Sequence, residues 1–313
     1  MKALVCGSMA YDTIMVFEDQ FKNHILADQV HILNVCFFVP NMRREFGGCA
    51  GNIAYNLKLL GGEPEILATV GDDFEPYRNQ LKKQGVSDSF VKQVSGTFTA
   101  QAFITTDQDN NQITAFHPGA MNFAHDNDFD AASKGVQLGI VAPDGKQAMH
   151  DHAKNFVDAQ IPFIFDPGQG LPMFSGDELK VFINQADYLV VNDYESKLMQ
   201  DKTGFSNQQM AEQLKALIVT KGGQGSDIYI DGKIIEIPCA EISQAIDPTG
   251  CGDAFRGGLL FGMLKGFDWE VTGRIASLCG AIKIEQGGTQ NHDFSLQSFF
   301  KRYEESFGEK LDL

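Results

Sequence analysis

The sequence is poor in positive charge. Its 313 residues include 25 lysines and arginines against 41 aspartates and glutamates, so the formal net charge is −16. Such an excess of negative charge repels nucleic acids and anionic membranes unless a basic patch intervenes, and the densest basic stretch is only NMRREF at 41–46. We therefore expect neither nucleic acid nor a membrane among the partners of this chain.

Clustered cysteines and long apolar runs are also lacking. The six cysteines lie far apart, form no C-x-x-C pair and have no histidine nearby at a zinc-ligand spacing, so we expect reduced thiols. The apolar run in the N-terminal stretch MKALVCGSMAYD is too short for a secretory or membrane-spanning segment. These absences favour a cytoplasmic location.

What the chain does contain is a series of short apolar runs separated by helix-length segments. Parallel strands need long crossovers of this kind and are hidden on both faces, so the pattern predicts a three-layer α/β/α sandwich with a mostly parallel central sheet. The expected strands are KALVCG, EILATVG, GVQLGIVAP, IPFIFDPG, DYLVVND and ALIVTKGG. Three helical patterns near the C-terminus should cover this sheet, CGDAFRGGLLFGMLKGF, WEVTGRIASLCGAIKIEQ and SLQSFFKRYEES.

Two regions break the alternation, residues 12–45 and 97–119. The second alternates strand formers with polar residues around the turn-rich DQDNN, which is typical of an antiparallel hairpin exposed on one face. In the first region, DTIMVFE and HILNVCFF can add two further strands. We expect 12–45 and 97–119 to form a small β-sheet lid over an α/β domain made of 1–11, 46–96 and 120–313. The alternative is a surface hairpin without function.

The stretch AIDPTGCGDAF at 245–255 places two aspartates six positions apart, directly before an apolar helical pattern. Its turn consists of Gly250, Cys251, Gly252 and Asp253. Amides at a helix start lack internal partners and carry partial positive charge, which favours a phosphate oxygen. Asp253 can then accept a proton from a hydroxyl that attacks the γ-phosphorus of ATP, whereas Asp247 is expected to bind a cation or hold the loop. On spacing alone, helix capping by Asp253 is equally well supported.

The stretch DPTGCGDAFRGG resembles the C-terminal signature of the ribokinase-like family of carbohydrate and nucleoside kinases, which runs Asp-Thr-x-Gly-Ala-Gly-Asp-x-Phe. Pro248 stands in place of the threonine and Cys251 in place of the alanine. Neither change touches the glycines or the two aspartates, and Cys251 still contributes a backbone amide. The resemblance extends over nearly the whole chain and implies a ribokinase-like fold and ATP-dependent phosphorylation of an alcohol.

A second stretch, FGGCAGNIAYNLKLLGG at 46–62, is similar to the N-terminal signature of this family. By resemblance, Gly48 and Asn52 contact the ribose hydroxyls of the substrate, as does Asp12 at the end of the first strand. A carboxylate and an amide suit vicinal hydroxyls, and a glycine lets the ring approach closely. By itself GGCAGN would indicate a turn and a helix cap, but its pairing with the other motif favours a substrate site.

Three further stretches resemble the nucleotide side of the family's site. In VNDYE, Asn192 and Glu195 are implied to organise Mg²⁺ through water, and a single carboxylate suffices because Mg²⁺ keeps several waters. In VTKGGQGS, Thr220, Gly222 and Gly225 are implied to flank ATP. The stretch IEQGGTQ resembles the closing segment near adenine and a monovalent cation, so K⁺ is a further candidate cofactor. For VNDYE alone, an ordinary solvated helix start remains an alternative.

Other nucleotide-binding signatures are missing: there is no G-x-x-x-x-G-K-[ST] loop, no H-R-D or D-F-G set and no strand-linked G-x-G-x-x-G. Within the family, the chain looks like bacterial adenosine or broad purine nucleoside kinases. Arg256, expected to hold ATP phosphates, stands where many sugar kinases have a small or apolar residue, and the first motif lacks the lysine common in ribokinases. Gln101 and Phe116 of the lid are the expected base contacts, because a nucleobase needs aromatic or apolar faces. Nearby residues of the same kind are Phe98, Phe103 and Met121.

The expected reaction is therefore phosphorylation of a purine nucleoside 5′-hydroxyl by ATP. A sugar kinase acting on ribose or fructose is the alternative within the family, and a non-catalytic nucleoside- or sugar-binding protein is the alternative of another class. Both the base and the glycines of the anion site are present, which argues against the non-catalytic reading. Lids in this family sometimes pair between subunits, so monomer and homodimer are both left open.

Overall fold

The computed structural model describes residues 1–25, 32, 34–109 and 111–311. Its main sheet has nine strands in the order β13-β12-β11-β10-β9-β8-β1-β4-β5. Seven of them run parallel, and β12 and β13 form an antiparallel extension at one edge. The strands are β1 (Lys2–Cys6), β4 (Glu63–Val70), β5 (Val91–Gln93), β8 (Val136–Val141), β9 (Phe163–Phe165), β10 (Tyr188–Asn192), β11 (Ala216–Thr220), β12 (Ser226–Ile230) and β13 (Lys233–Ile237).

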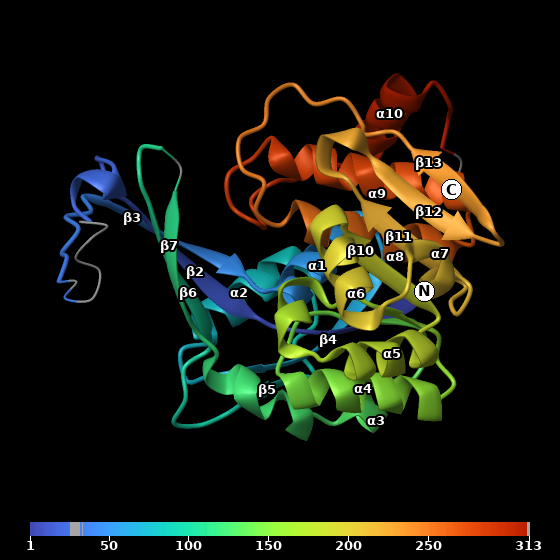
Figure 1. Cartoon of the computed structure of the whole chain (residues 1–313), viewed down its shortest axis with the longest axis horizontal. Helices are drawn as coiled ribbons and strands as arrows, with labels where there is room; N and C mark the ends of the chain where they lie inside the picture. The colour runs from blue at the N-terminus through green and yellow to red at the C-terminus, as the bar shows by residue number, and fades with distance from the viewer. Residues whose placement is uncertain (26–31, 33, 110, 312–313) are drawn as a thin grey trace.

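Helices cover both faces of this sheet (Figure 1). Side chains of β1 alternate between two separate hydrophobic clusters, Ala3 and Val5 in one and Leu4 and Cys6 in the other. The first cluster includes residues of α1 (Cys49–Leu59), α2 (Glu75–Gln84), α8 (Cys251–Lys265), α9 (Trp269–Ile284) and α10 (Leu296–Phe307). The second includes residues of α3 (Phe129–Ala132), α4 (Lys146–Asp158), α5 (Gly176–Gln185), α6 (Asp193–Thr203) and α7 (Asn207–Ala211). The predicted three-layer arrangement with a mostly parallel sheet is confirmed.

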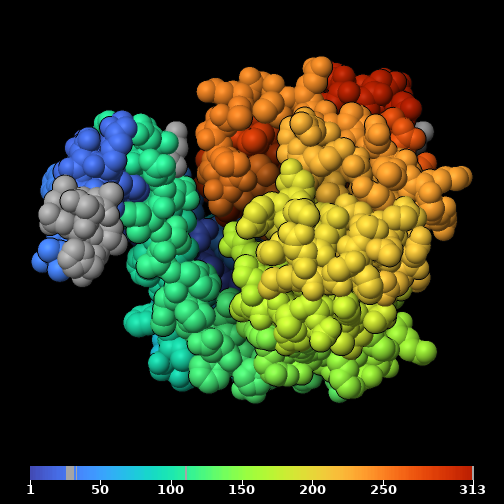
Figure 2. Space-filling view, in the orientation of Figure 1, coloured from blue at the N-terminus to red at the C-terminus, as the bar shows by residue number. Residues whose placement is uncertain are grey.

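A second sheet of four strands stands to one side of this body (Figures 1 and 2). Its order is β3-β2-β6-β7, with β2 and β6 parallel and the two outer strands antiparallel to their neighbours. The strands are β2 (Ala10–Val16), β3 (Asn41–Gly47), β6 (Ala100–Thr106) and β7 (Gln112–His117). The assignment of 12–45 and 97–119 as a lid stays a prediction. Of the turn DQDNN, Asn110 lies outside the described residues.

One expected strand was placed wrongly. Residues 34–38 of HILNVCFF are not a strand, and His31 and Leu33 lie outside the described residues. The partner of β2 is instead the charged segment NMRREFG, which pairs along its whole length from Ala10 opposite Gly47 to Val16 opposite Asn41. An edge strand tolerates charge because one side of it faces solvent, so hydrophobicity was the wrong criterion here.

Close helix packing brings α8 against α1 and α9. A Cβ atom on Gly257 would lie 2.6 Å from Cβ of Asn56, and one on Gly258 would lie 2.7 Å from Cα of Ala276. Only glycine allows these backbones to approach so closely. In the part of the chain that the structure describes, no helix is both long enough and apolar enough to cross a bilayer.

This packing predicts the effect of adding one methyl group. Gly258→Ala should lower the free energy of unfolding by about 1–3 kcal/mol, because the new Cβ overlaps the α9 backbone. Gly280→Ala on α9 is the matched control, since its Cβ would meet only Cys251 O at 3.5 Å. The control should be neutral or up to about 1 kcal/mol more stable, because alanine favours a helix over glycine. Urea unfolding of both variants measures the difference, and equal midpoints would contradict the packing argument.

Candidate active site

The amino end of α8 is built as an exposed row of backbone amides. Gly250 precedes the helix with φ of 80°, and no side chain caps it. The amide of Cys251 donates to the carbonyl of Pro248 at 3.2 Å, whereas those of Gly252 and Asp253 have no hydrogen-bond partner among the described residues. With the positive end of the helix dipole behind them, these groups can receive an anion.

Asp253, on the first turn of α8, is held by the first helix of the chain. Asn52 Nδ2 donates to Asp253 Oδ2 at 2.8 Å, and Asn52 Oδ1 accepts from Gln290 Nε2 at 2.9 Å. Gln290 Nε2 also donates to the hydroxyl of Tyr77 at 2.7 Å, and Gln290 Oε1 accepts from Gln84 Nε2 at 3.1 Å. This chain of donors fixes the orientation of the Asn52 amide, so its nitrogen is the atom that faces the carboxylate.

The environment of Asp253 raises the pKa of its carboxyl group. Burial raises its pKa to about 6, and the negative charge of Asp166 adds to the rise. The hydrogen bond from Asn52 and the positive charge of Arg256 act in the opposite direction. A carboxylate with a pKa near 6 is ionised at neutral pH and is still basic enough to accept a proton, which is what a general base requires.

Arg256 lies under the same turn in a buried ion pair. Its Nε and Nη2 donate to the two carboxylate oxygens of Asp166 at 2.6 and 2.7 Å, and its Nη1 donates to the carbonyl of Gly252 at 3.2 Å. The side chains of Arg256 and Asp166 are only 7% and 2% exposed. The guanidinium that was expected to hold ATP phosphates is therefore bound to a carboxylate and to the backbone of the anion-site turn.

The second sheet brings Asp12 toward this site. Burial raises the pKa of Asp12 to about 6, and the neighbouring charges of Glu45 and Asp247 raise it further. A Cβ atom on Gly47 would lie 2.4 Å from Asp12 Oδ2, so a larger residue here would displace the Asp12 carboxylate. Gly48, with φ of 85°, directly precedes α1. Asn52 lies in the first turn of that helix.

Strand register separates the expected base contacts. Asp12 pairs with Ala102, which pairs with Phe116, so these side chains share one face of the sheet. Phe116 is 52% exposed on that face. Gln101 lies one residue earlier and so on the opposite face, where its Nε2 donates to Asp73 Oδ2 at 3.1 Å. Figure 2 shows a hollow between this blue and green sheet and the orange part of the body.

The expected nucleotide-side residues lie at the carboxyl ends of neighbouring parallel strands. Asn192 ends β10, and with Glu195 it forms a reciprocal cap on α6, Glu195 N donating to Asn192 Oδ1 at 2.7 Å and Asn192 N to Glu195 Oε2 at 2.8 Å. Thr220 ends β11 beside β10. Gly222 and Gly225 follow it with φ of 54° and 84°. Ligands of open parallel sheets bind at this edge.

Two of the carboxylates expected near a cation have different surroundings. Burial raises the pKa of Glu195, and the nearby charge of Asp166 adds to the rise. Burial also opposes ionisation of Asp247, but hydrogen bonds from the amides of Gly288 and Thr249, each 2.9 Å long, hold its pKa below the usual value. Asp247 thus ties two loops together. Within the described ranges, no group of three or more histidine, cysteine or acidic side chains forms a metal cluster.

Sequence reasoning missed Asp166, Gln290 and Tyr77. Asp166 directly follows the buried strand β9, just as Asn192 ends β10, and that position was an available signal. Tyr77 and Gln290 are buried polar residues from α2 and from a C-terminal loop. Their roles depend on contacts across long sequence separations, which no local pattern indicates.

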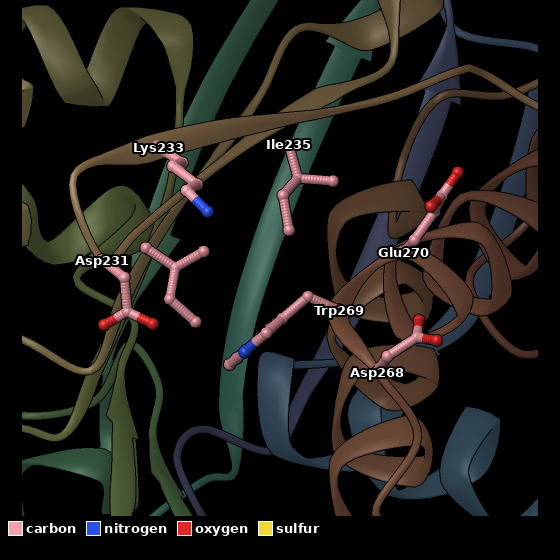
Figure 3. A pocket seen from close by; sticks show the side chains of 7 residues that line it. Asp231, Lys233, Ile235, Asp268, Trp269 and Glu270 are labelled. Atoms are coloured by element: carbon pink, nitrogen blue, oxygen red, sulfur yellow. The ribbon is translucent and has the colours of Figure 1, made fainter.

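A surface pocket of about 340 Å³ lies elsewhere on the molecule. Figure 3 shows Asp231 and Lys233 of the β12–β13 hairpin facing Trp269 at the start of α9. None of the expected site residues lines this pocket. It is therefore separate from the site at the start of α8.

The exposed amides at the amino end of α8, the buried Asp253 beside them and the α/β/α fold are the features expected of a phosphotransferase with a hydroxyl acceptor. Comparison with known proteins identifies the family within this class. The family described as pfkB family carbohydrate kinase matches residues 23–295, and the chain belongs to that family. ATP is the expected phosphoryl donor in a kinase of this family.

Relatives extend over almost the full chain. The nucleoside kinase of Methanocaldococcus jannaschii is 35% identical over 266 residues, covering 83% of this chain and 85% of the relative. The structure of Burkholderia thailandensis nucleoside kinase in complex with inosine has a TM-score of 0.90 and 50% identity, covering 98% of this chain and 99% of that one. The same kinase in complex with ADP-inosine has a TM-score of 0.87 and 51% identity, with coverages of 98% and 97%.

The Asn52 contact predicts a measurable pKa change. Asn52→Leu should raise the pKa of Asp253 above about 6, because the substitution removes a hydrogen bond that favours the carboxylate. The carboxyl ¹³C shift of Asp253, followed against pH, measures this value. Asn79→Leu, at an exposed position on α2, is the control and should leave it unchanged. A pKa that stays the same or falls in Asn52→Leu would contradict the assignment.

Proposed function

We propose that this protein is an ATP-dependent kinase that phosphorylates the 5′-hydroxyl of a purine nucleoside, as adenosine kinases do. The observation that carries the proposal is the 2.8 Å bond between Asn52 and Asp253 at the amino end of α8. It joins the expected ribose-binding segment to the expected base and anion site. The similarity to nucleoside kinases, one of them described in complex with inosine and with ADP-inosine, supports the nucleoside class.

In the proposed reaction, the Asp253 carboxylate accepts the proton of the 5′-hydroxyl as that oxygen bonds to the γ-phosphorus. The bond between the γ-phosphorus and the bridging oxygen breaks, and its electron pair leaves with ADP. The amides of Gly252 and Asp253, which have no hydrogen-bond partner among the described residues, are proposed to face the charge on the transferring group. Those of Gly250 and Cys251 in the same turn are proposed to join them, the Cys251 amide also donating to the Pro248 carbonyl at 3.2 Å. Phosphoryl transfer relies mainly on positioning and charge stabilisation, so one base and a row of amides form a sufficient protein contribution.

Arg256 is proposed to act on ATP through the turn it supports. Its guanidinium is engaged by Asp166 and reaches the carbonyl of Gly252, so it holds the first turn of α8 in place. Thr220, Gly222 and Gly225 are proposed to border the nucleotide at and just after the end of β11. Asp12, Gly48 and Asn52 are proposed to bind the ribose.

Mg²⁺ fits the residues near Asn192 and Glu195. The raised pKa of Glu195, caused by burial and by Asp166, marks a place where a cation would relieve unfavourable negative charge. Glu195 would hold Mg²⁺ through water, and the ion would offset charge on the ATP phosphates. K⁺ does not fit equally well, because the ammonium of Lys283 already binds the carbonyl oxygens of Asp247 and Gln286 between the two loops expected near it.

Phe116 is the proposed base contact. It shares a sheet face with Asp12, and its ring is half exposed, so a purine held over the ribose-binding carboxylate could stack on it. Phe103 also belongs to this sheet, but it pairs with Ala115 and Thr13 on the opposite face. A free sugar would leave the face of Phe116 without a partner, which favours a nucleoside over ribose or fructose.

A substrate panel tests the proposed reaction. ADP release with adenosine, inosine and guanosine should exceed that with ribose and fructose. Asp253→Asn should lower kcat about 10²- to 10⁴-fold while nucleoside binding persists, because only the proton acceptor is lost. Faster turnover of a free sugar than of every nucleoside would favour the sugar kinase alternative. Nucleoside binding with no turnover by the unmodified protein would favour the non-catalytic one.

The role of Phe116 predicts a selective change in KM. Phe116→Ala should raise KM for purine nucleosides about tenfold, roughly the 1–1.5 kcal/mol of an aromatic contact, and leave kcat for ribose unchanged. Phe103→Ala is the matched control, since this ring is 40% exposed on the other face. Steady-state kinetics on both variants gives the result. Equal effects of the two substitutions would remove Phe116 from the base site.

A further inference from the structure

Lys283 is a buried lysine that the proposed reaction does not use. It lies in the last turn of α9, and it is 0% exposed. An unpaired buried ammonium is very costly, so its contacts must compensate for lost hydration. Its Nζ donates to the carbonyl oxygen of Asp247 at 2.7 Å and to that of Gln286 at 3.1 Å.

The two carbonyls belong to loops that meet beneath the site. The amides of Ile246 and Asp247 both donate to the carbonyl of Ile284, at 2.8 and 3.0 Å. The amide of Gly288 donates to Asp247 Oδ2 at 2.9 Å. The ammonium of Lys283 therefore lies at a junction where residues 246–250 and 284–289 are already tied together by backbone hydrogen bonds.

Both loops lead directly to proposed catalytic groups. The first loop ends at Gly250, the residue directly before α8. A Cβ atom on Gly250 would lie 3.1 Å from Cγ2 of Thr289 in the second loop. The second loop continues to Gln290, which holds Asn52. A shift at the junction would consequently move the anion-site amides and the residue that faces Asp253.

The groups around Lys283 offset part of the cost of burying its charge, although its pKa remains below the usual value because of that burial. Burial lowers the pKa of Lys283, whereas the neighbouring Asp247 and Cys251 act to raise it. Both contacts are carbonyl acceptors, and the carboxyl end of α9 adds the negative end of a helix dipole. Two carbonyl oxygens at a helix end provide the kind of oxygen ligands that a small monovalent cation would receive.

We propose that the ammonium of Lys283 serves as a built-in monovalent cation that positions the loop before α8, so that this enzyme needs no added K⁺. Lys283 is a positioning residue, because it touches neither substrate nor reacting atoms. The catalytic readout of this inference rests on the proposed function. A tethered cation cannot dissociate, so the junction stays organised at any salt composition.

Cation dependence tests this inference in the unmodified protein and in Lys283→Ala. The unmodified enzyme should show the same kcat in K⁺, Na⁺ or N-methylglucamine at equal ionic strength. Lys283→Ala should lose roughly 10- to 100-fold in kcat, the scale of one charge-assisted hydrogen bond, with a smaller change in nucleoside KM. K⁺ or NH₄⁺, but not N-methylglucamine, should restore at least part of the lost kcat by entering the vacated space.

A thermal readout separates this inference from the proposed function. K⁺ should raise the melting temperature of Lys283→Ala more than that of the unmodified protein, whatever the substrate is. Lys301→Ala, with a lysine side chain 78% exposed on α10, is the control and should match the unmodified protein. A folded Lys283→Ala with no specific response to K⁺ or NH₄⁺ would overturn the inference. If that variant does not fold, strong activation of the unmodified enzyme by K⁺ would overturn it, and equal rates in all three cations would support it.

Discussion

The site depends on the close approach of α1 and α8. Gly257 lets the two backbones come together, since a Cβ atom there would lie 2.6 Å from Asn56 Cβ and 3.1 Å from the amide of Leu57. Four residues before Gly257 on α8 is Asp253, and four before Asn56 on α1 is Asn52. The helix contact therefore brings the amide of Asn52 to 2.8 Å from the Asp253 carboxylate. The proposed ribose contacts and the proposed base share one site because these helices touch.

Several buried carboxylates lie at this site, and their surroundings raise the pKa of two of them. The two carboxylates Asp12 and Asp253 both have a pKa of about 6, in each case chiefly because they are buried. Basic side chains nearby are already paired, Arg256 with Asp166 and Lys221 with Asp227 at 2.6 Å. Phosphate binding by backbone amides suits such a site, because amides carry no counter-charge that would suppress the basicity of Asp253.

Sequence reasoning indicated the segments of the candidate site more readily than it indicated side-chain partners. The glycine turn at 250–252 and the helix after it follow from residue type alone, because glycine permits the φ of 80° that Gly250 adopts. The expected phosphate contact of Arg256 depended on family resemblance. The structure pairs Arg256 with Asp166, 90 residues away in the chain, and no local rule foresees such a pair. The misplaced strand of the second sheet had a similar cause, since edge position decides whether a charged segment such as NMRREFG can be a strand.

The sequence by itself determined the alternation of buried strands and helices, and with it the parallel sheet whose strand ends carry Asn192 and Thr220. It also determined most of the places where the chain can turn sharply, because glycine adopts positive φ more readily than any other residue. Tertiary structure alone decided which face of the second sheet Phe116 and Gln101 occupy relative to Asp12, since a pairing shifted by one residue reverses every side chain. It also decided that Lys283 is buried beneath α8. A lysine in the last turn of a helix usually reaches solvent, and only the meeting of two distant loops provides the carbonyl oxygens that replace its water.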